Sequence, residues 1–267
     1  VDNRIYTHVC GKTPPAHLRL VMVGAQWSAK SSAGNIILKK DAFSVYHRRT
    51  TEYCEIGHSV VAHRHLTVVD SPGWFYNHTL QDTCEMDKSE IKRSMYLCPP
   101  GPHAILLVVG LSSAFNASYQ RAVQEHMSMF SEEVWNHTIV LFTRDWLKHR
   151  PIEEYIAGEG KALQQLVEKC RNEYHVLNCN FYIHQEVLDL FPKIYRMVAK
   201  NKGHYSTMEE EWNRREQELI DHMLRAIALE NEPVPPHVKM AASLDGVFVP
   251  SSKFDFILRN TDKISGH

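Results

Sequence analysis

The stretch LRLVMVGAQWSAKS, residues 18–31, joins a run of aliphatic residues to a short loop that ends in Lys30 and Ser31. The aliphatic run is typical of a buried β-strand, and helical periodicity follows the loop. A loop of the form Gly-x-x-x-x-Gly-Lys-Ser/Thr in this position surrounds phosphates with backbone N–H groups, while the Lys bridges the outer phosphates and the hydroxyl binds Mg²⁺. Gly24, Lys30 and Ser31 have this spacing, but Ala29 replaces the second glycine. The loop alone is equally compatible with a phosphate site and with an ordinary strand-to-helix connection.

A second loop, Asp70-Ser-Pro-Gly73, follows the predicted strand 65–70. An Asp at a strand end can hold the water shell of Mg²⁺, and a following Gly lets a backbone N–H approach a γ-phosphate. The same residues also make a plain turn. Because both loops lie at the carboxyl ends of predicted parallel strands, where α/β sheets bind ligands, the pair favours a nucleotide site.

The remaining chain alternates predicted strands and helices, which indicates an α/β fold with a mainly parallel sheet covered by helices on both faces. The predicted strands are 18–23, 59–63, 65–70, 104–110, 138–143 and 174–177. The predicted helices are 31–40, 82–96, 119–130, 152–172, 187–200 and 208–229.

Composition narrows the functional class. The 267 residues are 43% hydrophobic and 23% charged, as in globular proteins, and their net charge of −1 gives no electrostatic case for nucleic acid. The apolar runs are too short for a bilayer, so we expect no transmembrane segment. Six cysteines never form a Cys-x-x-Cys pair, which favours reduced thiols in a cytoplasmic protein over a disulfide framework. The start lacks both Met and an apolar signal region, so we expect a fragment or a processed form.

Several motifs together resemble the GTPase-of-immunity-associated-protein family (GIMAP, or immune-associated nucleotide-binding proteins). Within this family the chain resembles fish members, and some of its motifs depart from the family pattern. The most specific match is the box Cys98-Pro-Pro-Gly-Pro-His103, which leads into the apolar run 104–109. The other matching segments are 18–24 with 30–35, Thr51, Asp70–Gly73, 141–144 and 174–178. The resemblance covers residues 18–229.

This resemblance implies a Ras-like P-loop G domain with a C-terminal helical extension, which binds GTP or GDP with Mg²⁺ and forms homo-oligomers through the G domain. The implied nucleotide-binding residues are Gly24, Ser28, Ala29, Lys30, Ser31, Ser32, Gly73, Thr143, Asp145 and Asn178. The implied metal-binding residues are Ser31, Thr51 and Asp70. On this basis we divide the chain into an N-terminal extension (1–16), the G domain (17–203), a C-terminal helix (204–230) and a linker and tail (231–267).

Two departures from the family pattern lie in the phosphate loop. Ala29 stands where the family has Gly, and a positive φ there would cost about 1–2 kcal/mol, or roughly 5- to 30-fold in affinity. Trp27 is unusually large for a residue beside a triphosphate. These departures predict weakened nucleotide binding.

Two further departures concern base recognition and hydrolysis. The segment Thr143-Arg-Asp145 is one residue shorter than the Thr-x-Gly-Asp of the family. Trp74, rather than a Gln that would orient water, follows Gly73, so we predict at most a slow GTPase with no assigned catalytic residue. Trp74-Phe-Tyr76 is either an exposed surface used in dimers or a loop anchored in the core. The sequence leaves two functions open: a nucleotide-dependent switch, or a nucleotide-free pseudo-GTPase that acts as an interaction scaffold.

Overall fold

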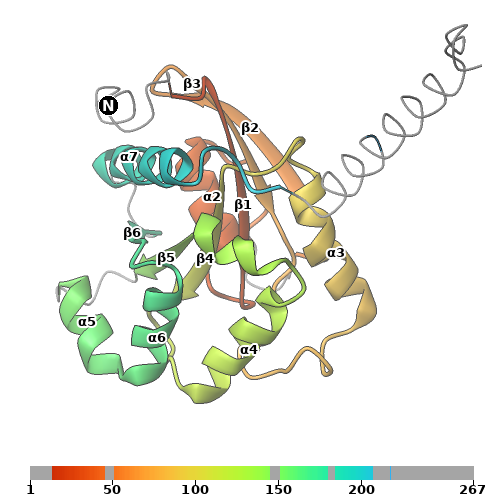
Figure 1. Ribbon diagram of the computed structural model, residues 1–267, viewed down its shortest axis with the longest axis vertical. Helices are drawn as coiled ribbons and strands as arrows, with labels where there is room; N and C mark the ends of the chain where they lie inside the picture. Colours follow the sequence, from red (N-terminus) through yellow and green to blue (C-terminus); the bar gives the residue numbers. More distant parts are fainter. Residues whose placement is uncertain (1–13, 46–50, 145–150, 180–183, 207–216, 218–267) are drawn as a thin grey trace, which may run out of the picture. The chain divides into compact units, whose positions relative to one another are not determined.

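The computed structural model describes residues 14–45, 51–144, 151–179, 184–206 and 217. Residues 14–206 of this set form a six-stranded sheet with helices on both faces (Figure 1). The strands are β1 (His17–Gly24), β2 (Glu55–Val61), β3 (Arg64–Asp70), β4 (Ala104–Gly110), β5 (Thr138–Arg144) and β6 (Tyr174–Asn178). The helices are α2 (Lys30–Leu38), α3 (Glu85–Tyr96), α4 (Ala117–Met127), the 3₁₀ helix η1 (Glu132–His137), α5 (Ile152–Glu159), α6 (Lys161–Lys169) and α7 (His184–Lys200).

The sheet has the strand order β2-β3-β1-β4-β5-β6. All neighbouring strands are parallel except β2 and β3, which are antiparallel. Every residue of β4 except Gly110 is buried, as its uninterrupted apolar sequence predicts. The expected α/β fold with a mainly parallel sheet is confirmed.

Two hydrophobic clusters lie on the two faces of the sheet. Val21 and Val23 of β1 belong to the cluster with α3, α4 and α6. Leu20 and Met22, which alternate with them, belong to the cluster with α2 and α7. This division follows from the period of two along a strand, and Figure 1 shows the two sets of helices on opposite sides of the sheet.

The predicted strand 59–63 was wrong in its boundaries. β2 begins at Glu55 and ends at Val61, and Ala62 and His63 form the turn to β3 with φ of 49° and 61°. Two successive residues with positive φ make the tight hairpin turn that fits strand twist. The start of β2 was missed because this edge strand alternates exposed and buried residues instead of showing an apolar run.

The predicted helix 152–172 was also wrong, because the structure contains two helices in this region. α5 ends at Glu159 and α6 begins at Lys161. Gly160 between them has a φ of 111°, which breaks the helical hydrogen bonding. The sequence signal for this break was Gly160, a glycine inside a segment with helical periodicity.

The chain divides into two units, Val1–Arg214 and Arg215–His267, and everything described here except Gln217 belongs to the first. Beyond α7, residues 201–206 form turns and irregular backbone. The predicted helix at 208–229 and tail at 231–267 lie outside the described residues, apart from Gln217, so the domain boundaries stay predictions. None of the helices in the described part of the chain combines the length and apolarity that a membrane span requires.

Candidate functional site

The loop between β1 and α2 keeps a strained shape without glycine at its bends. Ala29, the N-cap of α2, has φ 63° and ψ 32°, in the left-handed region. Trp27 has a φ of 59°. An L-residue in this region costs roughly 1–2 kcal/mol relative to right-handed backbone. From the sequence we expect a positive φ at position 29 to have this cost. The structure shows that this position does require a positive φ and that Ala29 adopts it. Strain of this kind collects at functional loops.

Lys30 is buried, and its ammonium group lies under the loop. Its Nζ donates to the carbonyl oxygens of Gly24 at 3.3 Å and Ala25 at 3.0 Å. Burial lowers its pKa to about 8, while the charge of Asp70 acts in the opposite direction. An ammonium has three N–H donors, so these two carbonyls leave one for an anion.

Ser31, Thr51 and Asp70 bring three oxygen-bearing side chains together beside Lys30. Ser31 Oγ donates to Asp70 Oδ2 at 2.5 Å, and Thr51 Oγ1 lies 3.5 Å from both atoms. Burial raises the pKa of Asp70, against the charge of Lys30 and the bond from Ser31. Asp70 Oδ1 is buried and has no hydrogen-bond partner among the described residues. This set of hard oxygen donors with an unpaired carboxylate oxygen fits Mg²⁺.

Gly73 lies against the phosphate loop. A Cβ atom at this position would be 2.6 Å from Lys30 Nζ and 2.7 Å from the backbone nitrogen of Gln26. The next residue, Trp74, accepts a hydrogen bond from the Gln26 N–H at 2.7 Å and forms a parallel bridge with Ala25. Only glycine fits at position 73 while the two loops are held this close.

The sequence left open whether the aromatic residues 74–76 are anchored in the core or exposed on the surface, and the structure shows some of each. Trp74 is buried in the core, whereas Phe75 is 39% and Tyr76 45% exposed. Trp27 of the phosphate loop is 71% exposed and contacts Phe75 edge-on, with ring centroids 5.6 Å apart. An exposed aromatic patch of Trp27, Phe75 and Tyr76 therefore lies beside the site.

Thr143 connects β5 to the phosphate loop, because its Oγ1 donates to the Ser28 carbonyl oxygen at 2.8 Å. Ser28 Oγ is buried without a hydrogen-bond partner in the described part of the chain. Ser32 is half-buried in the first turn of α2. Asn178 ends β6 in register with Arg144, and its backbone N–H donates to Glu186 at 2.7 Å. Asp145 lies outside the described residues.

The box of residues 98–103 takes no part in this site. It precedes β4, at the other end of the sheet from the phosphate loop. The Arg19 guanidinium donates to the Gly101 carbonyl at 2.8 Å, and the Arg19 N–H donates to His103 Nδ1 at 3.1 Å. The N–H of Tyr205 donates to the Pro102 carbonyl at 2.9 Å. The box is thus a packing element that connects β1 with the segment after α7.

The family model described as "AIG1 family" matches residues 18–223, which include the phosphate loop, Asp70–Gly73 and the box. The chain belongs to the AIG1 family. This AIG1 chain is 30% identical over 198 residues to human GTPase IMAP family member 8, an alignment that covers 71% of this chain and 29% of that protein. The chain thus spans less than a third of this relative's length. The resemblance to the family is confirmed, and the resemblance to fish members stays a prediction.

Two solved structures share the fold of this AIG1 chain. Toc33 from Arabidopsis thaliana in complex with GDP and Mg²⁺ has a TM-score of 0.57 at 13% identity, covering 72% of this chain and 88% of Toc33. The structure of the chloroplast translocon components atToc33 and psToc159, for whose GTPase activity dimerization is important, has a TM-score of 0.54 at 13% identity, covering 70% of this chain and 84% of that one. The expected P-loop G-domain fold is therefore confirmed.

Proposed function

We propose that this chain is a guanine-nucleotide-binding switch protein that binds GTP or GDP with Mg²⁺. The observation that carries the proposal is the cluster of Lys30, Ser31 and Asp70 under the phosphate loop. A buried ammonium, a buried carboxylate with one unpaired oxygen and a loop in left-handed conformation are costly to keep together, and a bound polyphosphate with its cation would use all three. Guanine is proposed because family relatives carry GTPase names.

The residues have separate roles in this proposal. Lys30 would neutralise the outer phosphates, while backbone N–H groups from Ser28 to Ser32 would bind the inner ones. Ser31 and Thr51 would hold Mg²⁺ directly and Asp70 through water; the ion would supply charge neutralisation of the phosphates. Gly73 would face the outermost phosphate. Thr143, Asp145 and Asn178 are proposed for the base side of the site.

Hydrolysis in this proposal is slow or absent. Trp74 follows Gly73, and its ring is buried and stacked on His126. An indole offers one N–H donor and no acceptor, so it cannot accept a proton from an attacking water. No residue is assigned as catalytic.

Nucleotide-dependent self-association through the G domain is the second part of the proposal. The exposed Trp27, Phe75 and Tyr76 lie beside the phosphate loop, where a bound nucleotide would change their surroundings. Exposed aromatic side chains are enriched at protein interfaces. The dimerization reported for the translocon components supports this idea by analogy.

We also propose a cytoplasmic location, because the six cysteines never form a Cys-x-x-Cys pair and their spacing favours reduced thiols.

A nucleotide-free scaffold is the alternative function, and one observation favours it. The Gln26 N–H, which belongs to the phosphate loop, already bonds to the Trp74 carbonyl. Such a bond would hold the loop together without a ligand.

Equilibrium binding of fluorescent GTP and GDP to the purified chain, with and without Mg²⁺, tests the two functions. The proposal expects micromolar or tighter binding that GTP competes and ATP does not. Light scattering with a non-hydrolysable GTP analogue would then report self-association, and phosphate release would report hydrolysis. No binding by a chain that melts cooperatively would support the scaffold.

A further inference from the structure

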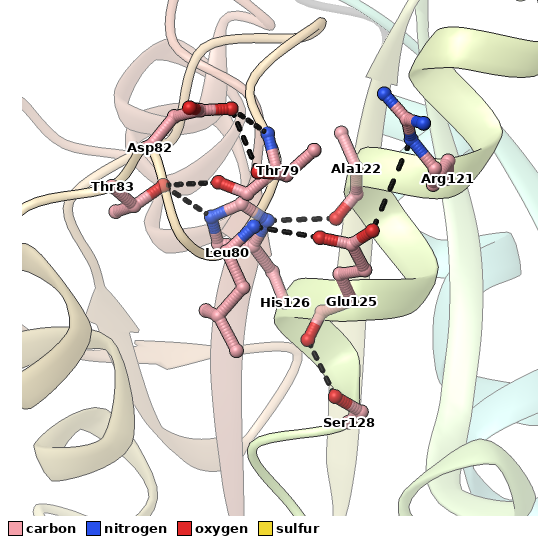
Figure 2. Close-up of polar contacts among 9 residues, drawn as sticks. All are labelled: Thr79, Leu80, Asp82, Thr83, Arg121, Ala122, Glu125, His126 and Ser128. Atoms are coloured by element: carbon pink, nitrogen blue, oxygen red, sulfur yellow. Dashed lines mark hydrogen bonds and ion pairs between the residues drawn. The ribbon is translucent and has the colours of Figure 1, made fainter.

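The segment that carries Gly73 has neither helix nor strand and runs for 14 residues, 71–84, between β3 and α3. Long irregular segments need anchors to keep one conformation. The start of this segment bonds to β1, because Ser71 Oγ donates to the Met22 carbonyl oxygen at 2.8 Å. Its later part bonds to α4 (Figure 2): the Leu80 N–H donates to Glu125 Oε2 at 2.8 Å, and Thr83 Oγ1 lies 2.7 Å from His126 Nε2.

His126 lies at the centre of this attachment and is fully buried. Its Nδ1 lies 2.7 Å from the Ala122 carbonyl oxygen, which can only accept, so Nδ1 carries a proton. Burial lowers the pKa of His126, and the bond to Ala122 and the charge of Glu125 oppose this only in part. The neutral ring therefore accepts at Nε2, and the Thr83 hydroxyl, which also lies 3.2 Å from the Thr79 carbonyl oxygen, donates to it over the shorter distance of 2.7 Å. Sequence reasoning missed His126, because a single histidine in a helix gives no motif.

The ring of His126 also supports Trp74. The two rings are stacked, with centroids 4.5 Å apart and an interplanar angle of 11°. Trp74 in turn bonds to the phosphate loop through its carbonyl, and Gly73 beside it lies against Lys30. A continuous set of contacts thus leads from α4 through His126 and Trp74 to the phosphate loop.

We propose that His126 is a positioning residue which, through Trp74 and Thr83, fixes Gly73 beside Lys30 and so sets the preference of the site for a nucleoside triphosphate over a diphosphate. This inference rests on the proposed nucleotide-binding function. A third phosphate is the part of the ligand that would reach Gly73, whereas a diphosphate would contact the loop and Lys30. If the segment is already held in place, the third phosphate does not have to order it on binding.

Two variants remove the contact between Thr83 and His126 in different ways and leave the bond from Leu80 to Glu125 in place. His126→Phe keeps an aromatic ring against Trp74 but removes both hydrogen bonds, and Thr83→Val removes one hydroxyl at nearly constant shape. Two matched controls keep the attachment. Thr83→Ser retains the hydroxyl, and Ser128→Ala changes an exposed residue of the same region whose hydroxyl donates to the Glu125 carbonyl at 2.7 Å (Figure 2).

The experiment measures the dissociation constants of a non-hydrolysable GTP analogue and of GDP for the full chain and each variant, after cooperative melting shows that each is folded. We expect His126→Phe and Thr83→Val to weaken the triphosphate about fivefold or more while GDP stays within about twofold. Thr83→Ser and Ser128→Ala should keep the original ratio. A parallel loss of both affinities would indicate a purely structural role and overturn the proposal, as would an unchanged ratio in a folded His126→Phe or Thr83→Val.

A second measurement needs no nucleotide. The imidazole ¹⁵N spectrum of the free chain should show neutral His126 protonated at Nδ1, and protonation at Nε2 would overturn the arrangement. Failure of the unmodified chain to bind either nucleotide would overturn the proposed function itself. If the unmodified chain binds both nucleotides and the variants keep its ratio of GTP-analogue to GDP dissociation constants, only the role proposed for His126 is excluded.

Discussion

The two ends of the sheet differ in how their polar groups are paired, although each buries an atom without a hydrogen-bond partner among the described residues: His137 Nδ1 just before β5, and Asp70 Oδ1 at the end of β3. At the box, before β4, Arg19 bonds to Gly101 and His103, so these groups find their partners within the chain. At the phosphate loop, Ser28 Oγ and Asp70 Oδ1 are buried without partners among the described residues. Native proteins leave few buried polar atoms unpaired, and those that remain call for an explanation. The comparison teaches that residues 98–103 pack the chain together, whereas the loop after β1 gathers the groups from which we propose nucleotide binding.

The largest expected effect tests the functional end. Lys30→Ala should weaken GTP and GDP binding by about 100-fold, or roughly 3 kcal/mol, because it removes the buried ammonium that would pair with the phosphates. Fluorescence titration measures the loss. Lys40→Ala, an exposed lysine just after α2, is the matched control and should bind normally. Binding by Lys30→Ala within about fivefold of the original would exclude Lys30 from the site.

The next effect tests the box end. A Cβ atom at Gly101 would overlap the Tyr205 carbonyl oxygen, so Gly101→Ala should lower the free energy of unfolding by about 3 kcal/mol. Nucleotide affinity of the folded protein should not change. Gly158→Ala has no atom within 4 Å of the new Cβ and lies within α5, so it should raise stability by about 0.5–1 kcal/mol. Urea denaturation measures both, and a loss of nucleotide affinity in folded Gly101→Ala would contradict the division between the ends.

The change of nucleotide affinity with pH should be smaller than the loss expected for Lys30→Ala. Burial lowers the pKa of Lys30 to about 8 in the free protein, and a polyphosphate would raise it again because it favours the charged form. Binding should therefore take up a proton above pH 8, and affinity should fall about tenfold between pH 7 and pH 9. Titration calorimetry in buffers of different ionisation enthalpy detects the proton. An affinity that rises with pH over this range would show that the ammonium does not meet the phosphates.

The smallest effect sharpens the role of Ala29. Because its φ is already positive without a ligand, the strain belongs to the folded protein, and Ala29→Gly should raise the free energy of unfolding by about 1 kcal/mol. Any tightening of nucleotide binding would then report relief of methyl crowding alone. Ala33→Gly, buried within α2, should have the opposite sign, losing about 1 kcal/mol. Equal destabilisation by both substitutions in thermal melts would exclude strain at position 29.

Local pattern predicted most of the fold, with errors where the pattern was weak. The apolar runs of β1, β4 and β5 gave their positions closely, since strands buried on both faces have a continuous apolar signal. The half-exposed β2 was misplaced, and the break at Gly160 was missed because periodicity continues on both sides of it. For the site, the spacing of Gly24, Lys30 and Ser31 located the loop between β1 and α2 but fitted an ordinary connection equally well, and the roles of these residues toward a nucleotide stay predictions.

The sequence by itself determined the strand–helix order, the phosphate-loop spacing and the family, because these depend on residue types at short, fixed separations. Only the tertiary structure decided that Ala29 adopts a left-handed conformation, that Ser31 bonds to Asp70, and that Trp74 is buried on His126 while Phe75 is exposed. Ser31 and Asp70 are 39 positions apart, and Trp74 and His126 are separated still further along the chain. Contacts at such separations form when strands pair and helices pack, and periodicity encodes which face a residue occupies but not which distant atom it meets.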